Sequence, residues 1–208
     1  FARLIGTIHR GGYERRSELK DEFGDWTFFE DLRLEPYYAY TARQVDGARD
    51  FLEDLIRCTR ERRLTLVHGD YSPKNILVDG NHLVLLDHEV IHFGDPAFDI
   101  GFSMTHLLSK SHHVRNCRES FIRAADRYWH EYYQHVEDSD WSEELEEHAV
   151  GHILGCLLAR VAGKSQLEYM SNEERSHQKN AVVALMNNRP AAVPQLIRQF
   201  RHQIEMQE

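Results

Sequence analysis

One short region of this 208-residue chain departs from the spacing of apolar residues found in the rest, and this limits the folds that the chain can adopt. Most segments carry an apolar residue every three or four positions, which is the pattern of an amphipathic helix. The exception is three short β-branched or leucine-rich runs at residues 64–67, 76–78 and 83–86. Asp79-Gly80-Asn81, between the last two runs, has the turn chemistry of a β-hairpin. A mainly α (α+β) fold with one small hairpin region is therefore predicted.

Helical spacing occupies the chain on both sides of this region. Before it, an amphipathic helix is predicted from about residue 41 to 63. After it, Asp95 supplies a capping side chain and Pro96 a proline at the first helical position, which predicts a helix to about Leu108. Four more helices are predicted around the apolar residues of segments 121–132, 150–161, 181–186 and 196–200.

Composition excludes several classes of protein. The formal net charge of -9 argues against nucleic acid as the main partner, because phosphate backbones are bound by clustered Lys and Arg. No run of about 18 apolar residues could span a membrane, and the first residues lack the features of a signal peptide. Three widely spaced cysteines fit reduced thiols. A cytoplasmic protein without a membrane or nucleic-acid partner is predicted.

Residues 88–92 match HExxH, a pattern that holds zinc when its two histidines share one face of a helix. A predicted strand precedes the motif, and Gly94-Asp95-Pro96 follows too closely for a useful helix. In an extended chain the histidines would stand roughly 13 Å apart, too far to share one zinc ion. A strand would instead project Asp87 and Glu89 from one face, and paired carboxylates suit hard cations such as Mg²⁺.

The loop between the first two predicted strands, His68-Gly69-Asp70-Tyr71-Ser72-Pro73-Lys74-Asn75, supplies an acid and an amide, and the hairpin after it delivers Asp87. Phosphoryl transfer needs such a set. One carboxylate accepts the proton of an attacking hydroxyl, while an amide and a second carboxylate hold Mg²⁺ against nucleotide phosphates. Taken singly, a strand end or a turn explains each residue better. Together and in this order, they predict a phosphotransfer site.

HGDYSPKN at 68–75, LDHEV at 86–90 and GDPAFDIG at 94–101 together resemble the aminoglycoside phosphotransferase and choline kinase superfamily, relatives of the protein kinases. The resemblance covers the chain from its first helix to at least Gly101, and the helical remainder, including residues 159–165, is also similar. It implies a lobe that transfers the γ-phosphate of ATP to a hydroxyl of an aminoglycoside-like or related small substrate. Mg²⁺ (or Mn²⁺) is the implied metal.

The resemblance implies a role for each matching position. Asp70 would be the catalytic base, and Asn75 and Asp87 would hold Mg²⁺ and so bind the nucleotide. Glu89 would support a second metal ion, directly or through water.

Three further positions have supporting or open roles. His68 would be a structural histidine behind the loop, and Asp99 the buried aspartate that braces the loop through backbone hydrogen bonds. Lys74 has two interpretations: it contacts a phosphate of the nucleotide, or it is a solvated loop lysine.

A complete kinase of this type also has an N-terminal lobe with a phosphate-covering loop and a strand lysine. No GxGxxG occurs before residue 64, and Phe1, Leu4 and Ile5 already have helical spacing. The chain is therefore expected to be the C-terminal lobe alone, beginning inside a helix, with its ATP-binding lobe missing and with weak ATP binding and turnover. One unit, 1–208, is expected to contain a helical entry region (1–63), catalytic and metal-binding loops (64–101) and a helical substrate-side region (102–208).

Three functions stay open from the sequence: a small-molecule kinase, which is favoured, a nucleotide-binding pseudokinase or interaction module, and a zinc hydrolase. The substrate is open too. Acidic residues between positions 137 and 147 either attract a polycation or form the solvated start of a helix. Trp129, Tyr132 and Tyr133 either cage a quaternary ammonium group or belong to the core.

Overall fold

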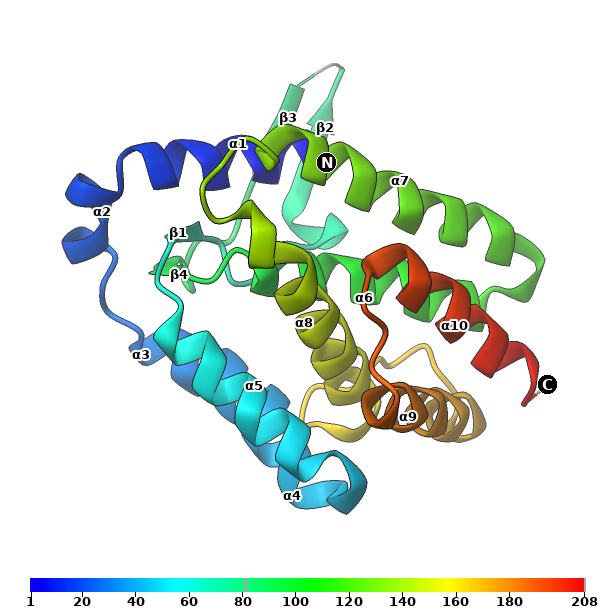
Figure 1. The fold of residues 1–208 in the computed structure, drawn as a ribbon. Helices are drawn as coiled ribbons and strands as arrows, with labels where there is room; N and C mark the ends of the chain where they lie inside the picture. The colour runs from blue at the N-terminus through cyan, green and yellow to red at the C-terminus, as the bar shows by residue number, and fades with distance from the viewer. Residues whose placement is uncertain (81, 208) are drawn as a thin grey trace.

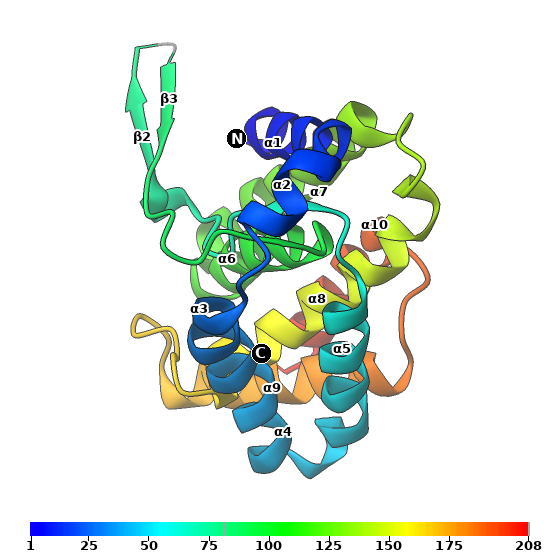
Figure 2. The same ribbon diagram turned by 90° about the vertical axis from the view of Figure 1, so that its left-hand side faces the viewer.

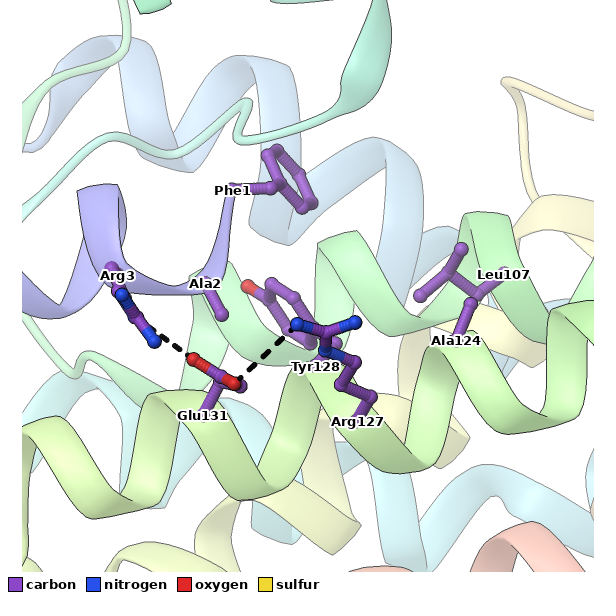
Figure 3. Close-up of a pocket in the computed structure, with 8 residues that line it drawn as sticks. All are labelled: Phe1, Ala2, Arg3, Leu107, Ala124, Arg127, Tyr128 and Glu131. Atoms are coloured by element: carbon purple, nitrogen blue, oxygen red, sulfur yellow. Dashed lines mark hydrogen bonds and ion pairs between the residues drawn. The ribbon is translucent and has the colours of Figure 1, made fainter. Parts of the chain in front are cut away.

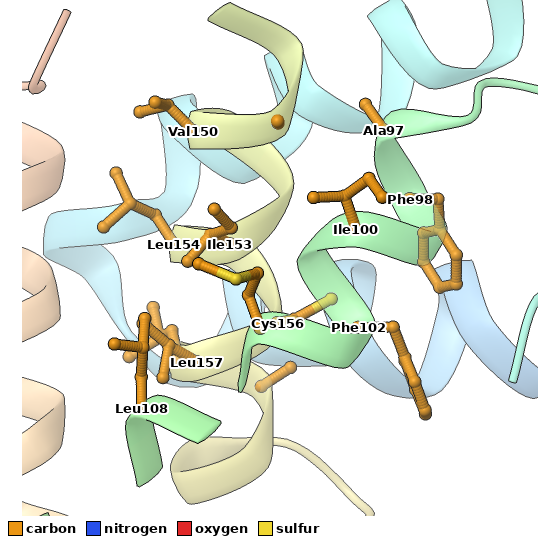
Figure 4. Packing of buried hydrophobic residues seen from close by; sticks show 14 of the residues in the cluster. Ala97, Phe98, Ile100, Phe102, Leu108, Val150, Ile153, Leu154, Cys156 and Leu157 are labelled. Carbon is orange, nitrogen blue, oxygen red and sulfur yellow. The ribbon is translucent and has the colours of Figure 1, made fainter. Parts of the chain in front are cut away.

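Helices α6 (Ala97–His113) and α8 (Ser142–Ala162) pack against each other at the centre of the molecule and form much of its core. Figure 4 shows Ile100 of α6 facing Ile153 of α8, and both side chains are fully buried, as is Phe98 of α6. Neither helix has a clear polar face, as expected for helices that other elements enclose. The central pair therefore fixes where the surrounding elements can lie.

The computed structural model describes residues 1–80 and 82–207. α1 (Ala2–Glu14) packs against α7 (Arg118–Val136), and α9 (Asn172–Asn187) packs against α10 (Val193–Glu205) (Figure 1). The 3₁₀ turn η4 (Arg115–Cys117) joins α6 to α7. The other helical segments precede the strands: α2 (Arg16–Glu22), α3 (Thr27–Phe29), the π-helix η1 (Glu30–Ala39), α4 (Tyr40–Gln44), the 3₁₀ turn η2 (Asp46–Ala48) and α5 (Arg49–Glu61).

The strands form two small antiparallel sheets. β1 (Thr65–Val67) pairs with β4 (His92–Gly94), and β2 (Ile76–Asp79) pairs with β3 (His82–Leu85). Figure 2 shows the β2–β3 hairpin projecting from the helical body. The hairpin confirms the prediction, and Gly80 adopts the positive φ of 56° that suits its turn. Asn81, the last residue of the predicted turn, lies outside the described residues.

The strand predictions were wrong in two places. β4 was missed, because a three-residue strand that is buried throughout shows no alternation of polar and apolar residues. β3 ends at Leu85 and does not continue towards Glu89. At Asp87 the chain takes a φ of 66°, the one positive φ at a non-glycine residue in the described part of the chain. The segment after β3 is therefore a loop, and alternation between strand faces does not apply to it.

The helix predicted from about residue 41 to 63 is interrupted. α4 ends at Gln44, and Val45 is extended before the chain turns into η2 and α5. In contrast, α6 continues past the predicted end at Leu108 to His113, because its last turns are still partly buried. α7, α8, α9 and α10 confirm the other four predicted helices.

No helix in residues 1–80 and 82–207 is long and apolar enough to cross a lipid bilayer. The cytoplasmic location remains a prediction. Cys58, Cys117 and Cys156 are all free thiols, as predicted.

Gly101→Ala is expected to destabilise the fold, because the added Cβ would lie 2.5 Å from the carbonyl carbon of His152 and force α6 away from α8. Overpacking of this kind lowers the free energy of unfolding by roughly 1 to 3 kcal/mol, which urea denaturation measures. Gly11→Ala in α1 is the control, since its Cβ would meet no atom within 4 Å and should add up to about 1 kcal/mol of helix propensity. Equal stability of the two variants would contradict the close packing.

Candidate active site

Asp70 lies in the loop between β1 and β2, which ends in the 3₁₀ turn η3 (Pro73–Asn75). The residue is only 3% exposed. Three donors contact its carboxylate: Arg33 Nη2 lies 3.0 Å from Oδ1, and Lys74 Nζ and Asn75 Nδ2 lie 3.1 and 2.7 Å from Oδ2. These contacts fix the orientation of the carboxylate and bring Asp70, Lys74 and Asn75 together, as the phosphotransfer hypothesis requires.

Asp99, in the first turn of α6, holds the backbone of this loop. Its Oδ2 accepts a hydrogen bond from the His68 N–H at 2.8 Å, and its Oδ1 accepts one from the Gly69 N–H at 2.9 Å. His9 Nε2 of α1 lies 3.1 Å from Oδ2, and His9 Nδ1 lies 2.8 Å from the hydroxyl of Tyr132 on α7. One buried carboxylate therefore ties the loop to α6 and, through His9, to two more helices.

The electrostatics of Asp99 follow from these contacts. Burial alone would raise the pKa of its carboxyl, but the hydrogen bonds and electrostatic attraction of His9 and His68 lower that pKa below the usual 3.8. The adjacent Gly69 has a φ of +77°, and a Cβ there would lie 2.9 Å from Val90. The loop thus needs glycine at this position as well as the buried carboxylate behind it.

His68 connects the loop to the segment that carries Asp87. Its Nδ1 accepts a hydrogen bond from the backbone N–H of Asp70 at 3.1 Å, and its Nε2–H donates to the Leu86 carbonyl at 3.0 Å. The side chain is buried. Because both ring nitrogens are already engaged, His68 has the surroundings of a positioning residue.

Asn75 and Asp87 present oxygen atoms that no described residue uses. Asn75 Nδ2 donates to the backbone oxygen and to Oδ2 of Asp70, at 2.9 and 2.7 Å, so the Asn75 Oδ1 atom remains without a protein donor. Asp87 and Glu89 are exposed, and neither forms a hydrogen bond or ion pair within residues 1–80 and 82–207. The expectation that Asp87 and Glu89 share a strand face is wrong, because β3 has already ended at Leu85.

These oxygen atoms fit a hard cation. Among the described residues, no three His, Cys, Asp or Glu side chains converge to form a metal site on their own. Mg²⁺ does not need such a cage, since proteins usually bind it through one or two carboxylates together with substrate phosphates and water. Asn75 Oδ1 and the Asp87 carboxylate, with Glu89 nearby in sequence, therefore suit Mg²⁺ that is shared with a nucleotide.

The HExxH pattern has no zinc-binding geometry. Residues 86–91 contain no helix, and His92 begins β4. His88 Nε2 donates to the Leu85 carbonyl at 3.1 Å, and His92 Nδ1 to the Val90 carbonyl at 3.0 Å. Burial also lowers the pKa of His92 to about 4. The two histidines are used in local structure, and the zinc-hydrolase hypothesis loses its basis.

A cleft of about 420 Å³ opens beside Asp70. Elements far apart in the sequence form its walls: η1, the loop that carries Asp70, α6, and α8 with the segment that follows it. Asn75, Asp87 and Glu89 are not among its lining residues, although Asn75 contacts Asp70 at its edge. Its lining residues are Asp31, Leu32, Arg33, Pro36, Tyr37, Asp70, Lys74, Phe102, His106, Arg160 and Ser165.

The sequence analysis assigned no role in the site to Arg33, His106 or Arg160, although Arg160 lies in the segment 159–165 that resembles the family. Arg33 donates through Nε to the Gly69 carbonyl at 2.6 Å, in addition to its ion pair with Asp70. It lies in the π-helix η1, a form that is often found at functional sites. No local motif marks these three residues, because only the packing of distant helices brings them to the loop.

The acidic residues between positions 137 and 147 do not line this cleft. Two of them occupy the first turn of α8, where the helix dipole favours negative charge. Glu144 pairs with Arg62, and Glu147 pairs with Arg189. The interpretation as a helix start fits these positions, and recruitment of a polycation to the cleft does not.

A second pocket, of about 470 Å³, lies between α1 and α7 (Figure 3). Phe1 and Tyr128 line it, and Glu131 forms ion pairs there with Arg3 and Arg127. None of the residues predicted for catalysis or metal binding lines this pocket. Cavity volume alone therefore does not identify the site.

The helical fold, the two small sheets and the loop around Asp70 define a lobe of the kinase-like phosphotransferase class. A model of the phosphotransferase enzyme family (APH) matches residues 1–145, well over half of the chain. The chain belongs to this family, which confirms the resemblance to the aminoglycoside phosphotransferase and choline kinase superfamily. A comparison with curated proteins finds no match.

Asp99→Asn is expected to loosen the loop that carries Asp70 and to destabilise the fold. The substituted amide offers one acceptor where the carboxylate offers two, which leaves a buried N–H of the loop without a partner. Breaking a buried charged network of this kind costs roughly 3 kcal/mol or more. Urea denaturation at pH 7 measures the loss, and Asp138→Asn, an exposed acid with no described partner, is the matched control.

The same variant changes the response of stability to acid. Because folding lowers the pKa of Asp99, its carboxylate stabilises the protein above the ordinary pKa of 3.8, and this contribution disappears as the pH falls through the folded-state pKa. Asp99→Asn should therefore show a shallower loss of stability below about pH 4. If the variant lost stability below about pH 4 as steeply as the unmodified protein, Asp99 would not be the source of this pH dependence.

Proposed function

We propose that this chain is the C-terminal catalytic lobe of an ATP- and Mg²⁺-dependent small-molecule kinase. It would transfer the γ-phosphate of ATP to a hydroxyl group of a substrate bound in the cleft beside Asp70. The family match supports phosphoryl transfer. The observation that carries the proposal is the Asp70 carboxylate, oriented by three donors and open to the cleft.

In this mechanism Asp70 accepts the proton of the substrate hydroxyl as its oxygen bonds to the γ-phosphorus, and ADP leaves with the former bridging oxygen. Arg33 and Asn75 keep the carboxylate in place, which limits the reorganisation that the reaction requires. Lys74 lines the same cleft with a side chain that is 64% exposed, and it would supply positive charge to the transferred phosphate. Asp99 and His68 act indirectly by fixing the backbone of the loop.

Asn75 and Asp87 would hold the metal, and Glu89 would support a second ion. When bound, Mg²⁺ supplies charge neutralisation on the nucleotide phosphates. The unpaired oxygen of Asn75 and the unpaired carboxylate of Asp87 support this assignment, since hard oxygen donors suit the ion.

The nucleotide clamp is proposed to come from an N-terminal lobe that these residues do not include. Within the described residues no strand precedes β1. The β2–β3 hairpin projects from the body and leaves Leu77, Val78 and Val84 exposed by 55%, 71% and 47%. Leu77 and Val84 pair across the hairpin on one face and Val78 lies on the other, and exposed apolar side chains grouped in this way are typical of a surface that another element covers. This surface supports the presence of a lobe that packs on the hairpin.

Asp70→Asn in the protein that carries this lobe is expected to lower kcat roughly 100- to 10,000-fold, because an amide cannot accept the hydroxyl proton. The assay is Mg²⁺-dependent ATP consumption across a panel of hydroxyl compounds. Asp21→Asn, an exposed acid on α2, is the matched control and should leave kcat unchanged.

Two results would contradict the proposal. Full turnover by Asp70→Asn would remove Asp70 from the base position. Nucleotide binding without turnover on a broad panel would favour the pseudokinase, which the intact Asp70, Asn75 and Asp87 otherwise argue against.

Asp87→Asn is expected to raise the Mg²⁺ concentration for half-maximal activity at least about tenfold, because a neutral amide is a weaker ligand for a hard cation. Electron paramagnetic resonance of bound Mn²⁺ in the presence of ATP measures the same loss without turnover. Asp79→Asn, at the tip of the same hairpin, is the control and should bind Mn²⁺ normally. Equal Mn²⁺ affinity of the two variants would exclude Asp87 as a ligand.

A further inference from the structure

The cleft beside Asp70 carries more positive than negative charge. Three cations line it, Arg33, Lys74 and Arg160, against the two carboxylates of Asp31 and Asp70. Arg33 and Lys74 both form ion pairs with Asp70. Asp70 is therefore already paired, and Asp31 alone offers a free negative charge. A polycationic acceptor would meet an unfavourable field here.

Arg160 is the cation in this cleft that lacks a counter-ion. Its Nη1 donates to the Tyr37 hydroxyl at 3.1 Å, to Ser165 Oγ at 2.9 Å and to the Ser165 carbonyl. Its Nε is buried and has no hydrogen-bond partner. No Asp or Glu in residues 1–80 and 82–207 forms an ion pair with it. Nη2 has no partner among the described residues either, and unlike Nε it is not among the buried atoms, so it is the guanidinium nitrogen that can donate to a carboxylate or phosphate in the cleft.

His106 adds a neutral polar group to the same cleft. It packs edge-on against Phe102, with ring centroids 5.6 Å apart. Burial, reinforced by the positive charge of Arg160, lowers the pKa of His106 to about 4, so the imidazole is neutral at pH 7. No described residue hydrogen-bonds to its ring. A neutral imidazole has one donor and one acceptor, which suits a second hydroxyl of a polyhydroxylated ligand.

We infer that the cleft binds an acceptor that carries an oxyanion, a carboxylate or a phosphate, and that Arg160 is the residue that binds it. Resting on the kinase function proposed above, this assigns the substrate class as anionic hydroxyl compounds. The oxyanion pairs with Nη2 of Arg160, and the reacting hydroxyl faces Asp70. Tyr37 and Ser165 hold the guanidinium in place, so its orientation is set before the ligand arrives.

A matched set of six-carbon probes tests the charge preference: glucose is neutral, gluconate carries a carboxylate, glucose 6-phosphate carries a phosphate, and glucosamine carries a cation. Binding to the 208-residue chain is measured by isothermal titration calorimetry. At least one anionic probe should bind roughly 10- to 100-fold more tightly than glucose, the gain that hydrogen bonds to a charged group give. Glucosamine should bind no more tightly than glucose. Comparing gluconate with glucose 6-phosphate shows which oxyanion the site prefers.

Arg160→Gln should abolish the preference for the anionic probes. Arg198→Gln, which removes an exposed positive charge on α10 outside the cleft, is the matched control. If Arg160→Gln does not fold, Arg160→Lys retains the charge but cannot keep one nitrogen on Tyr37 and Ser165 while another donates to the ligand, and it should still weaken binding. Ser165→Ala removes one support of the guanidinium and should cause a smaller loss. In the protein that carries the N-terminal lobe, the KM for ATP should not change in the variants that fold, because the site is assigned to the acceptor.

Absence of binding by both anionic probes, equal binding of glucosamine, or anion binding that survives Arg160→Gln would each overturn the inference. A change in the KM for ATP alone would assign Arg160 to the nucleotide and overturn it as well. These binding measurements do not depend on turnover. A protein that binds anions through Arg160 but never consumes ATP would refute the kinase proposal and leave the oxyanion site standing.

Discussion

The candidate site depends on the hydrogen bonds of the Asp99 carboxylate. This carboxylate receives two backbone N–H groups from the loop before Asp70, and it is itself held by His9. Burying a carboxylate is costly unless its oxygens are hydrogen-bonded, and here the partners are the atoms that must not move. The hydrogen bonds that offset the cost of burying the carboxylate therefore also order the loop. Because Asp99 belongs to α6, the position of Asp70 is set by the packing of α6 against α8 rather than by the short strands beside it.

The parts of the fold that the sequence predicted are those with a local physical cause. Helical spacing identified α7 to α10, and the turn chemistry around Gly80 identified the hairpin. The failures have non-local causes. β4 forms by pairing with β1, and its three residues show no strand pattern of their own in the sequence. The π-helix η1 includes Pro36, which no helical pattern in the sequence would suggest. The break in the helix at Val45 could not be predicted, because it depends on where α5 packs in the folded protein.

The site divides in the same way. The roles of Asp70, Asn75 and Asp87 are predictions from their spacing along one loop and the segment after one hairpin. Their mutual orientation could not be predicted, since it depends on the left-handed backbone at Asp87 and on His68 bridging two segments. The sequence assigned no role to Arg33 or Arg160, although Arg160 lies in the segment 159–165 that resembles the family. They reach the cleft from η1 and α8, and only the tertiary packing relates those elements to the loop.

This division has a functional consequence. The residues that would perform phosphoryl transfer come from one short segment, held from behind by Asp99 of α6, so their positions depend on how α6 packs and not on the individual side chains that line the cleft. The residues that would select the acceptor come from η1, α6 and α8, and each can change without disturbing the loop hydrogen bonds of Asp99. Arg33 is the exception, because it contacts both Asp70 and the Gly69 carbonyl. Arg33 lies in the cleft wall and also contacts the loop, so it is the residue through which a change in acceptor would affect the rate of the reaction.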